Sequence, residues 1–156
     1  MAVDLVYSRT YPVEHERAYD LVVPAPLPFI FAGRVGPLPP ITHVEQADDH
    51  WGDPGQTRVI RTSDGGTMTE TVVEADPPRT FAYELGDLTG PLKLLAATVE
   101  GRWTFAPAGT GVRITWSWRI TPTSSLAMPV LKAVGGFWQG YARRGFDRLE
   151  QLLVDG

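Results

Sequence analysis

The fold is decided by two strand-like runs, Thr98–Phe105 (TVEGRWTF) and Val112–Ile120 (VRITWSWRI), separated by a short loop containing Pro and Gly. Apolar and polar residues alternate along both, and a period of two places the apolar residues on one face of a strand. Two earlier runs have strand-like composition, Met68–Ala75 (MTETVVEA) and Thr80–Leu85 (TFAYEL). Strands of this length, separated by turn residues, predict an antiparallel sheet.

Further elements flank this central region. Alternation and composition predict three more strands at Ala2–Thr10, Ile41–Ala47 and Thr57–Thr62. Helical spacing predicts a short helix over Glu14–Val23 and a long one over Pro129–Val154. We therefore predict an α+β fold in which a bent antiparallel sheet is closed by a long C-terminal helix. Such a sheet can wrap around the helix and leave an internal cavity between them.

Length and composition favour one ordinary globular domain over residues 1–156, because 43% hydrophobic and 21% charged residues are typical values. A net charge of −4 argues against nucleic acid as a partner. No apolar run is long enough to predict a membrane span. The opening sequence MAVDLVYSR lacks the pattern of a secretory signal, so a cytoplasmic location is expected.

Residues able to hold a metal are scarce. Cysteine is absent, and His15, His43 and His50 are scattered without metal-ligand spacing. No nucleophile elbow or Gly-rich phosphate loop is present either. We expect neither a metal nor another cofactor.

The apolar face of the two central runs is rich in aromatic residues. Trp103, Trp116 and Trp118 share that face, and pairing across a six-residue loop predicts Phe105 opposite Val112 and Trp103 opposite Ile114. Tryptophan suits both a packed core and a ligand pocket, so the pattern alone leaves both interpretations open.

Two other segments supply candidate aromatic residues. On the long helix, Phe137 and Tyr141 belong to the predicted apolar stripe. In the proline-rich stretch 24–40, Phe29 and Phe31 must be buried, because exposing them would cost about 1.5–3 kcal/mol each. This stretch is either a rigid loop on the core or a lid over a cavity mouth.

Three polar residues are candidates to orient a ligand: Arg58, Glu70 and Tyr83. If the loop Asp64–Gly66 holds three residues, Arg58 and Glu70 lie diagonally on one face of the sheet. A two-residue turn would place them on opposite faces, and the sequence leaves this open.

The sequence also resembles a known family. The order Gly55-x-x-Arg58, Asp64-Gly65, Glu70, Asp76-Pro77-Pro78, Tyr83, Gly111 and Trp116 before a long terminal helix resembles the bacterial polyketide cyclase/dehydrase-like branch of the START-like (SRPBCC, Bet v 1-like) superfamily. The resemblance implies a helix-grip fold that binds lipids, polyketides or other apolar molecules in its cavity. The prolines between 24 and 40 depart from the family's ordinary second helix.

We therefore expect a cofactor-free protein that binds or transports a small hydrophobic or aromatic molecule. An alternative of another class is a polyketide aromatase/cyclase or dehydratase, in which Arg58, Glu70 or Tyr83 polarises a carbonyl. A homodimer is left open.

Overall fold

The computed structural model of the protein describes residues 1–155. Its strands are β1 (Val3–Tyr11), β2 (Ile41–Gln46), β3 (Thr57–Thr62), β4 (Thr67–Asp76), β5 (Thr80–Gly86), β6 (Ala96–Ala108) and β7 (Gly111–Pro122). Its helices are α1 (His15–Val22), α2 (Leu27–Ile30) and α3 (Met128–Leu153), with 3₁₀ turns η1 (Pro91–Leu94) and η2 (Ser125–Ala127). The predicted strands and both predicted helices are present.

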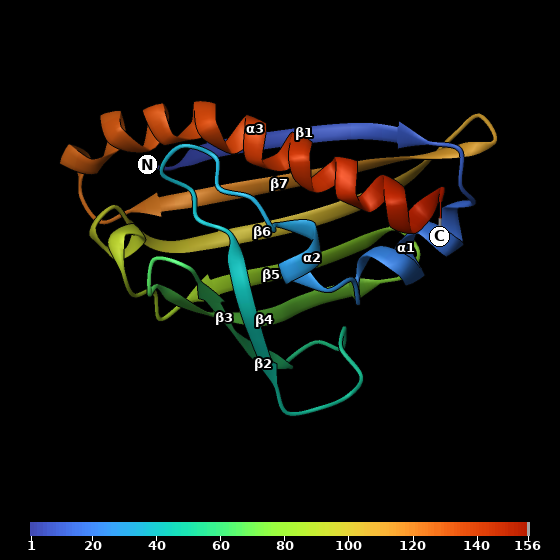
Figure 1. The fold of residues 1–156 in the computed structure, drawn as a ribbon, viewed down its shortest axis with the longest axis horizontal. Helices are drawn as coiled ribbons and strands as arrows, with labels where there is room; N and C mark the ends of the chain where they lie inside the picture. The colour runs from blue at the N-terminus through green and yellow to red at the C-terminus, as the bar shows by residue number, and fades with distance from the viewer. Residues whose placement is uncertain (156) are drawn as a thin grey trace.

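The strands form one antiparallel sheet in the order β1-β7-β6-β5-β4-β3-β2. Strands that follow one another in the chain pair as neighbours, except that β1 pairs with β7 at one edge. Figure 1 shows α3 running along the β1–β7 side of the sheet, with α2 between it and the β4 side. This is the predicted helix-grip arrangement.

The pairing of β6 with β7 differs from the predicted register by two residues. Phe105 lies opposite Ile114 and Trp103 opposite Trp116. The predicted six-residue loop is wrong, because the strands continue until Ala108 pairs with Gly111. Only two residues form the turn, and Gly109 has a φ of 60° that suits a tight hairpin. A shift of two leaves the inward and outward faces unchanged.

The turn between β3 and β4 resolves the open question about Arg58 and Glu70. The backbone of Thr62 hydrogen-bonds to Gly66, which leaves three residues, 63–65, in the loop. Arg58 therefore lies directly opposite Glu70 on one face, rather than diagonally from it. The loop begins at Ser63, one residue before the predicted start at Asp64. This difference changes which residues of β3 and β4 lie opposite each other.

The buried face of α3 is rotated from the predicted stripe. Phe137 and Val130 are 47% and 48% exposed, whereas Leu131 and Trp138 are fully buried. Gly135 is buried against β1, where a Cβ would lie 2.8 Å from the Leu5 side chain. The face of the helix that packs on the sheet therefore carries Leu131, Gly135 and Trp138.

The glycines of α3 give a test of this packing. Gly136 has no heavy atom near the position of a Cβ, so Gly136→Ala should stabilise the protein by about 1 kcal/mol through helix propensity. A Cβ at Gly145 would lie 2.7 Å from the Phe31 ring, so Gly145→Ala should destabilise it. Denaturant unfolding of both variants measures the difference. An equal gain in both would contradict the helix orientation.

Candidate functional site

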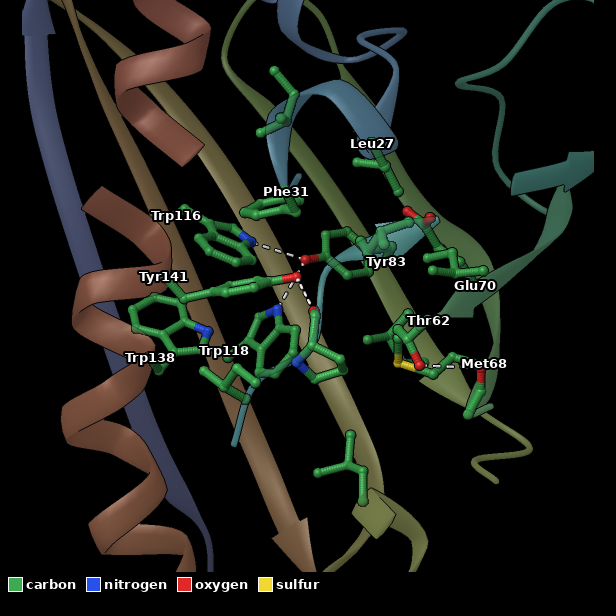
Figure 2. A pocket seen from close by; sticks show the side chains of 18 of the residues that line it. Leu27, Phe31, Thr62, Met68, Glu70, Tyr83, Trp116, Trp118, Trp138 and Tyr141 are labelled. Carbon is green, nitrogen blue, oxygen red and sulfur yellow. Dashed lines mark hydrogen bonds between the residues drawn. The ribbon is translucent and has the colours of Figure 1, made fainter. Parts of the chain in front are cut away.

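A cavity of about 170 Å³ lies between the inner face of the sheet, α2 and α3. Its wall is overwhelmingly apolar and is drawn in Figure 2. The aliphatic lining residues include Val22, Leu27, Ile30, Leu38, Ile41, Ile60, Met68, Leu85, Leu92, Leu95, Val134 and Leu149. An apolar cavity of roughly 150 Å³ in another protein binds benzene, so this one is large enough for a substituted single ring.

Aromatic rings form the wall on the β6–β7 side. The Trp103 and Trp116 rings stack with centroids 5.4 Å apart, and the Trp138 ring of α3 lies 4.6 Å from that of Trp116. Phe31, the residue that follows α2, stacks on Tyr141 of α3 at 4.9 Å. Rings from the sheet, from α3 and from the end of α2 therefore pack against one another around the cavity.

Tyr83 of β5 sits at the centre of this wall. Its hydroxyl oxygen accepts hydrogen bonds from Nε1 of Trp116 at 2.8 Å and from Nε1 of Trp118 at 3.0 Å (Figure 2). Burial raises the pKa of the Tyr83 hydroxyl above its ordinary value, with a smaller contribution in the same direction from Glu70. The hydroxyl is therefore protonated at neutral pH.

Gly101 of β6 makes room for the Tyr83 ring. The two residues are cross-strand partners, and a Cβ on Gly101 would overlap the ring atoms next to the hydroxyl. Gly101 is also the cross-strand partner of Trp118 on the other side. A glycine inside a strand marks a close approach, and here that approach positions the hydroxyl between two indoles.

Arg58 and Glu70 form a buried ion pair in the opposite wall. The Arg58 Nε donates to Glu70 Oε1 at 2.8 Å, and the two residues are only 7% and 3% exposed. The Trp51 ring, from the loop before β3, lies 4.1 Å from the guanidinium carbon. Both charged residues line the cavity.

Burial disfavours the charged form of the Glu70 carboxyl. Desolvation raises the pKa of Glu70, and the opposing effects of the Arg58 charge and hydrogen bond are smaller. A buried ion pair of this kind is weak evidence for stability, since desolvation offsets much of the attraction. A perturbed carboxyl in a cavity wall is instead a candidate functional group.

The cavity brings together eight of the ten residues singled out in the sequence. These are Phe31, Arg58, Glu70, Tyr83, Trp103, Trp116, Trp118 and Tyr141.

Phe29 and Phe137 are not among the residues that line the cavity. Phe29 packs under Arg148, whose guanidinium carbon lies 4.4 Å from the ring centroid. Phe137 is on the outer side of α3, with its ring against Gly36.

Sequence reasoning missed three aromatic residues. Phe81 of β5 and Trp138 of α3 line the cavity and are 2% and 0% exposed. Trp51 lies in an irregular acidic loop, where nothing in the pattern indicates a partner for Arg58. The size of both indoles was the one available signal, since large aromatic side chains are seldom left exposed.

Within residues 1–155, no group of three or more His, Cys, Asp or Glu side chains is arranged to hold a metal ion. In the same part of the chain, no helix is both long and apolar enough to cross a membrane.

Removing the glutamate from the buried ion pair should cost more stability than removing it from an exposed one. Glu70→Ala should destabilise the fold by about 3–5 kcal/mol, because it leaves the Arg58 charge buried without its partner. Glu45 and Arg61 provide a matched control on β2 and β3, paired at 2.7 Å but with side chains about half exposed. Glu45→Ala should cost much less. Similar losses in denaturant unfolding would show that the Arg58–Glu70 pair is not buried.

The close contact between Gly101 and the Tyr83 ring gives a second prediction about stability. Gly101→Ala should displace the Tyr83 ring and destabilise the protein by about 1–3 kcal/mol through overpacking. Gly86 on β5 is the control, since no heavy atom lies near the position of its Cβ. Tryptophan fluorescence follows the loss of the indole hydrogen bonds. Unchanged emission and stability in Gly101→Ala would contradict the close contact.

The bent sheet, the long C-terminal helix and the cavity between them define a helix-grip protein. Residues 3–154 match the family described as polyketide cyclase / dehydrase and lipid transport, and the chain belongs to this family. The resemblance predicted from the sequence is thereby confirmed. A general capacity to bind hydrophobic molecules goes with this membership. No curated protein matches the chain in sequence.

Solved structures with the same fold are distant in sequence. Ginseng major latex-like protein 151 from Panax ginseng has a TM-score of 0.71 at 13% identity, with 96% of each chain covered. MLL2253 from Mesorhizobium loti has a TM-score of 0.69 at 16% identity, again with 96% of each chain covered. Ara h 8.0201 has a TM-score of 0.68 at 18% identity, with 96% of this chain and 98% of that one covered. At these identities the likeness concerns the fold alone.

Proposed function

We propose that this protein binds and carries a small hydrophobic or aromatic molecule in the cavity between its sheet and α3. The observation that carries the proposal is the cavity itself, about 170 Å³ in volume and walled by aromatic and aliphatic side chains. Ligand sites are typically concave and largely apolar, with a few placed polar groups. Arg58, Glu70 and Tyr83 are the polar groups that we assign to that role.

The apolar wall also determines which kind of ligand binds. Transfer of apolar surface out of water contributes about 25 cal/mol per Å², so an uncharged ring gains by entering this cavity. A strongly hydrated ligand would lose its water against aliphatic side chains without recovering hydrogen bonds. Specificity for apolar molecules thus follows from the lining.

A matched pair of variants on α3 tests the proposal. Val134 is half-buried in the cavity lining, so Val134→Trp should fill the space and weaken isopropylbenzene binding by at least about tenfold. Val130 is on the same helix, 48% exposed and outside the lining, so Val130→Trp should change the dissociation constant by at most about twofold.

Calorimetric titration measures the affinities, and thermal denaturation verifies that both variants fold. Equal affinity in the two variants would show that isopropylbenzene binds elsewhere. Failure of the unmodified protein to bind would remove the proposed function.

A second candidate function is catalysis, as a polyketide aromatase/cyclase or dehydratase. The buried Arg58–Glu70 pair in the cavity wall favours it, because an ionisable pair in an apolar site can move a proton and polarise a carbonyl. Turnover of a poly-β-ketone with loss of water, detected by mass spectrometry and abolished in Glu70→Gln, would establish it. Binding without turnover leaves the carrier function.

A further inference from the structure

The Tyr83 hydroxyl carries a hydrogen-bond donor that no protein group uses. Both of its bonds are to indole N–H groups, at 2.8 Å from Trp116 and 3.0 Å from Trp118. An indole nitrogen donates and cannot accept, so Tyr83 is the acceptor in both bonds. Two donors occupy the acceptor sites of the phenol oxygen, and its own proton must point elsewhere.

Within residues 1–155, no acceptor receives the Tyr83 proton. Tyr141 donates its hydroxyl proton to the backbone oxygen of Pro39 at 3.0 Å, Glu70 Oε1 accepts from Arg58 Nε, and neither residue is hydrogen-bonded to Tyr83. A buried donor without an acceptor is unfavourable, so the cavity favours an occupant that supplies an acceptor.

A second unused donor lies in the same lining. Nε1 of Trp138 is buried and has no hydrogen-bond partner among residues 1–155. The aromatic side of the cavity therefore presents one N–H group and one O–H group whose protons have no acceptor in the protein. It is complementary to a ligand oxygen that accepts hydrogen bonds.

We propose that Tyr83 is the anchor for a carbonyl oxygen, so that the ligand is an apolar molecule carrying a ketone or a similar acceptor. The two indoles hold the phenol oxygen and direct its proton, while Gly101 leaves the space that the ring needs. Fixing the donor in advance removes the entropy cost of orienting it when the ligand binds. The burial of Tyr83 keeps the hydroxyl protonated, as this role requires.

The inference rests on the proposed function. A pair of isosteric probes distinguishes a failure of the Tyr83 assignment from a failure of the proposed function. Acetophenone and isopropylbenzene have nearly the same shape, but only the ketone has an acceptor. Tyr83→Phe should weaken acetophenone binding by about five- to tenfold and change isopropylbenzene binding by about twofold at most. The comparison is between proteins for each probe, because the two probes differ in water solubility.

The carbonyl stretch of bound acetophenone reports the bond directly by infrared spectroscopy. In the unmodified protein it should lie at lower wavenumber than in a hydrocarbon solvent, and Tyr83→Phe should abolish this shift. Tyr141→Phe is the matched control and should keep the shift, since the Tyr141 hydroxyl already donates to Pro39. Trp138→Phe should also keep the shift. Because this variant removes the other donor without a partner, it tests the assignment to Tyr83 even if Tyr83→Phe does not fold.

The outcomes are distinct. An unshifted stretch in the unmodified protein, a shift that survives in Tyr83→Phe, or one that is lost in Trp138→Phe would overturn the assignment while leaving apolar binding intact. Absence of binding by both probes would instead refute the proposed function itself.

Discussion

One helix cannot cover the apolar face of a seven-stranded sheet, and the rest of the structure depends on this mismatch of widths. Seven strands at about 4.8 Å spacing span roughly 29 Å, whereas a helix with its side chains is about 10–12 Å wide. Helix α3 lies along the β1–β7 side, so the inner faces of β3 to β5 need another cover (Figure 1). The short α2 and the proline-rich chain after it supply part of that cover, and the remaining space is the cavity.

The polar groups of the cavity follow from the cost of burying them. Arg58, Glu70 and the Tyr83 oxygen are held by partners on other strands, which offsets part of the cost of burying them. Arg58 and Glu70 pair directly across β3 and β4, and Tyr83 receives its two hydrogen bonds from β7 across β6. Tyr83 of β5 can reach the indoles of β7 only because the residue between them on β6, Gly101, has no side chain. The sheet therefore both shapes the cavity and orients its few polar groups.

The sequence predicted most of the fold because period-two alternation is a strong local signal. It placed the three indoles of β6 and β7 on the inner face correctly. It did not fix the register, since a turn of two or six residues between Trp103 and Trp116 preserves the faces equally well. The orientation of α3 was not predicted, because helical spacing alone pointed to Phe137 instead of Trp138 as the buried residue. Contacts with irregular segments, such as that of Trp51 with Arg58, have no local signal at all.

We propose that a small apolar molecule enters the space between the sheet and α3. The most direct measurement is the set of nuclear Overhauser effects between isopropylbenzene protons and the protein in solution. We expect contacts from the ligand methyl groups or ring to Trp116, Trp118 and Tyr83, whose side chains line the cavity. Contacts confined to exposed apolar residues such as Leu94 and Leu126, which are 77% and 86% exposed, would contradict it.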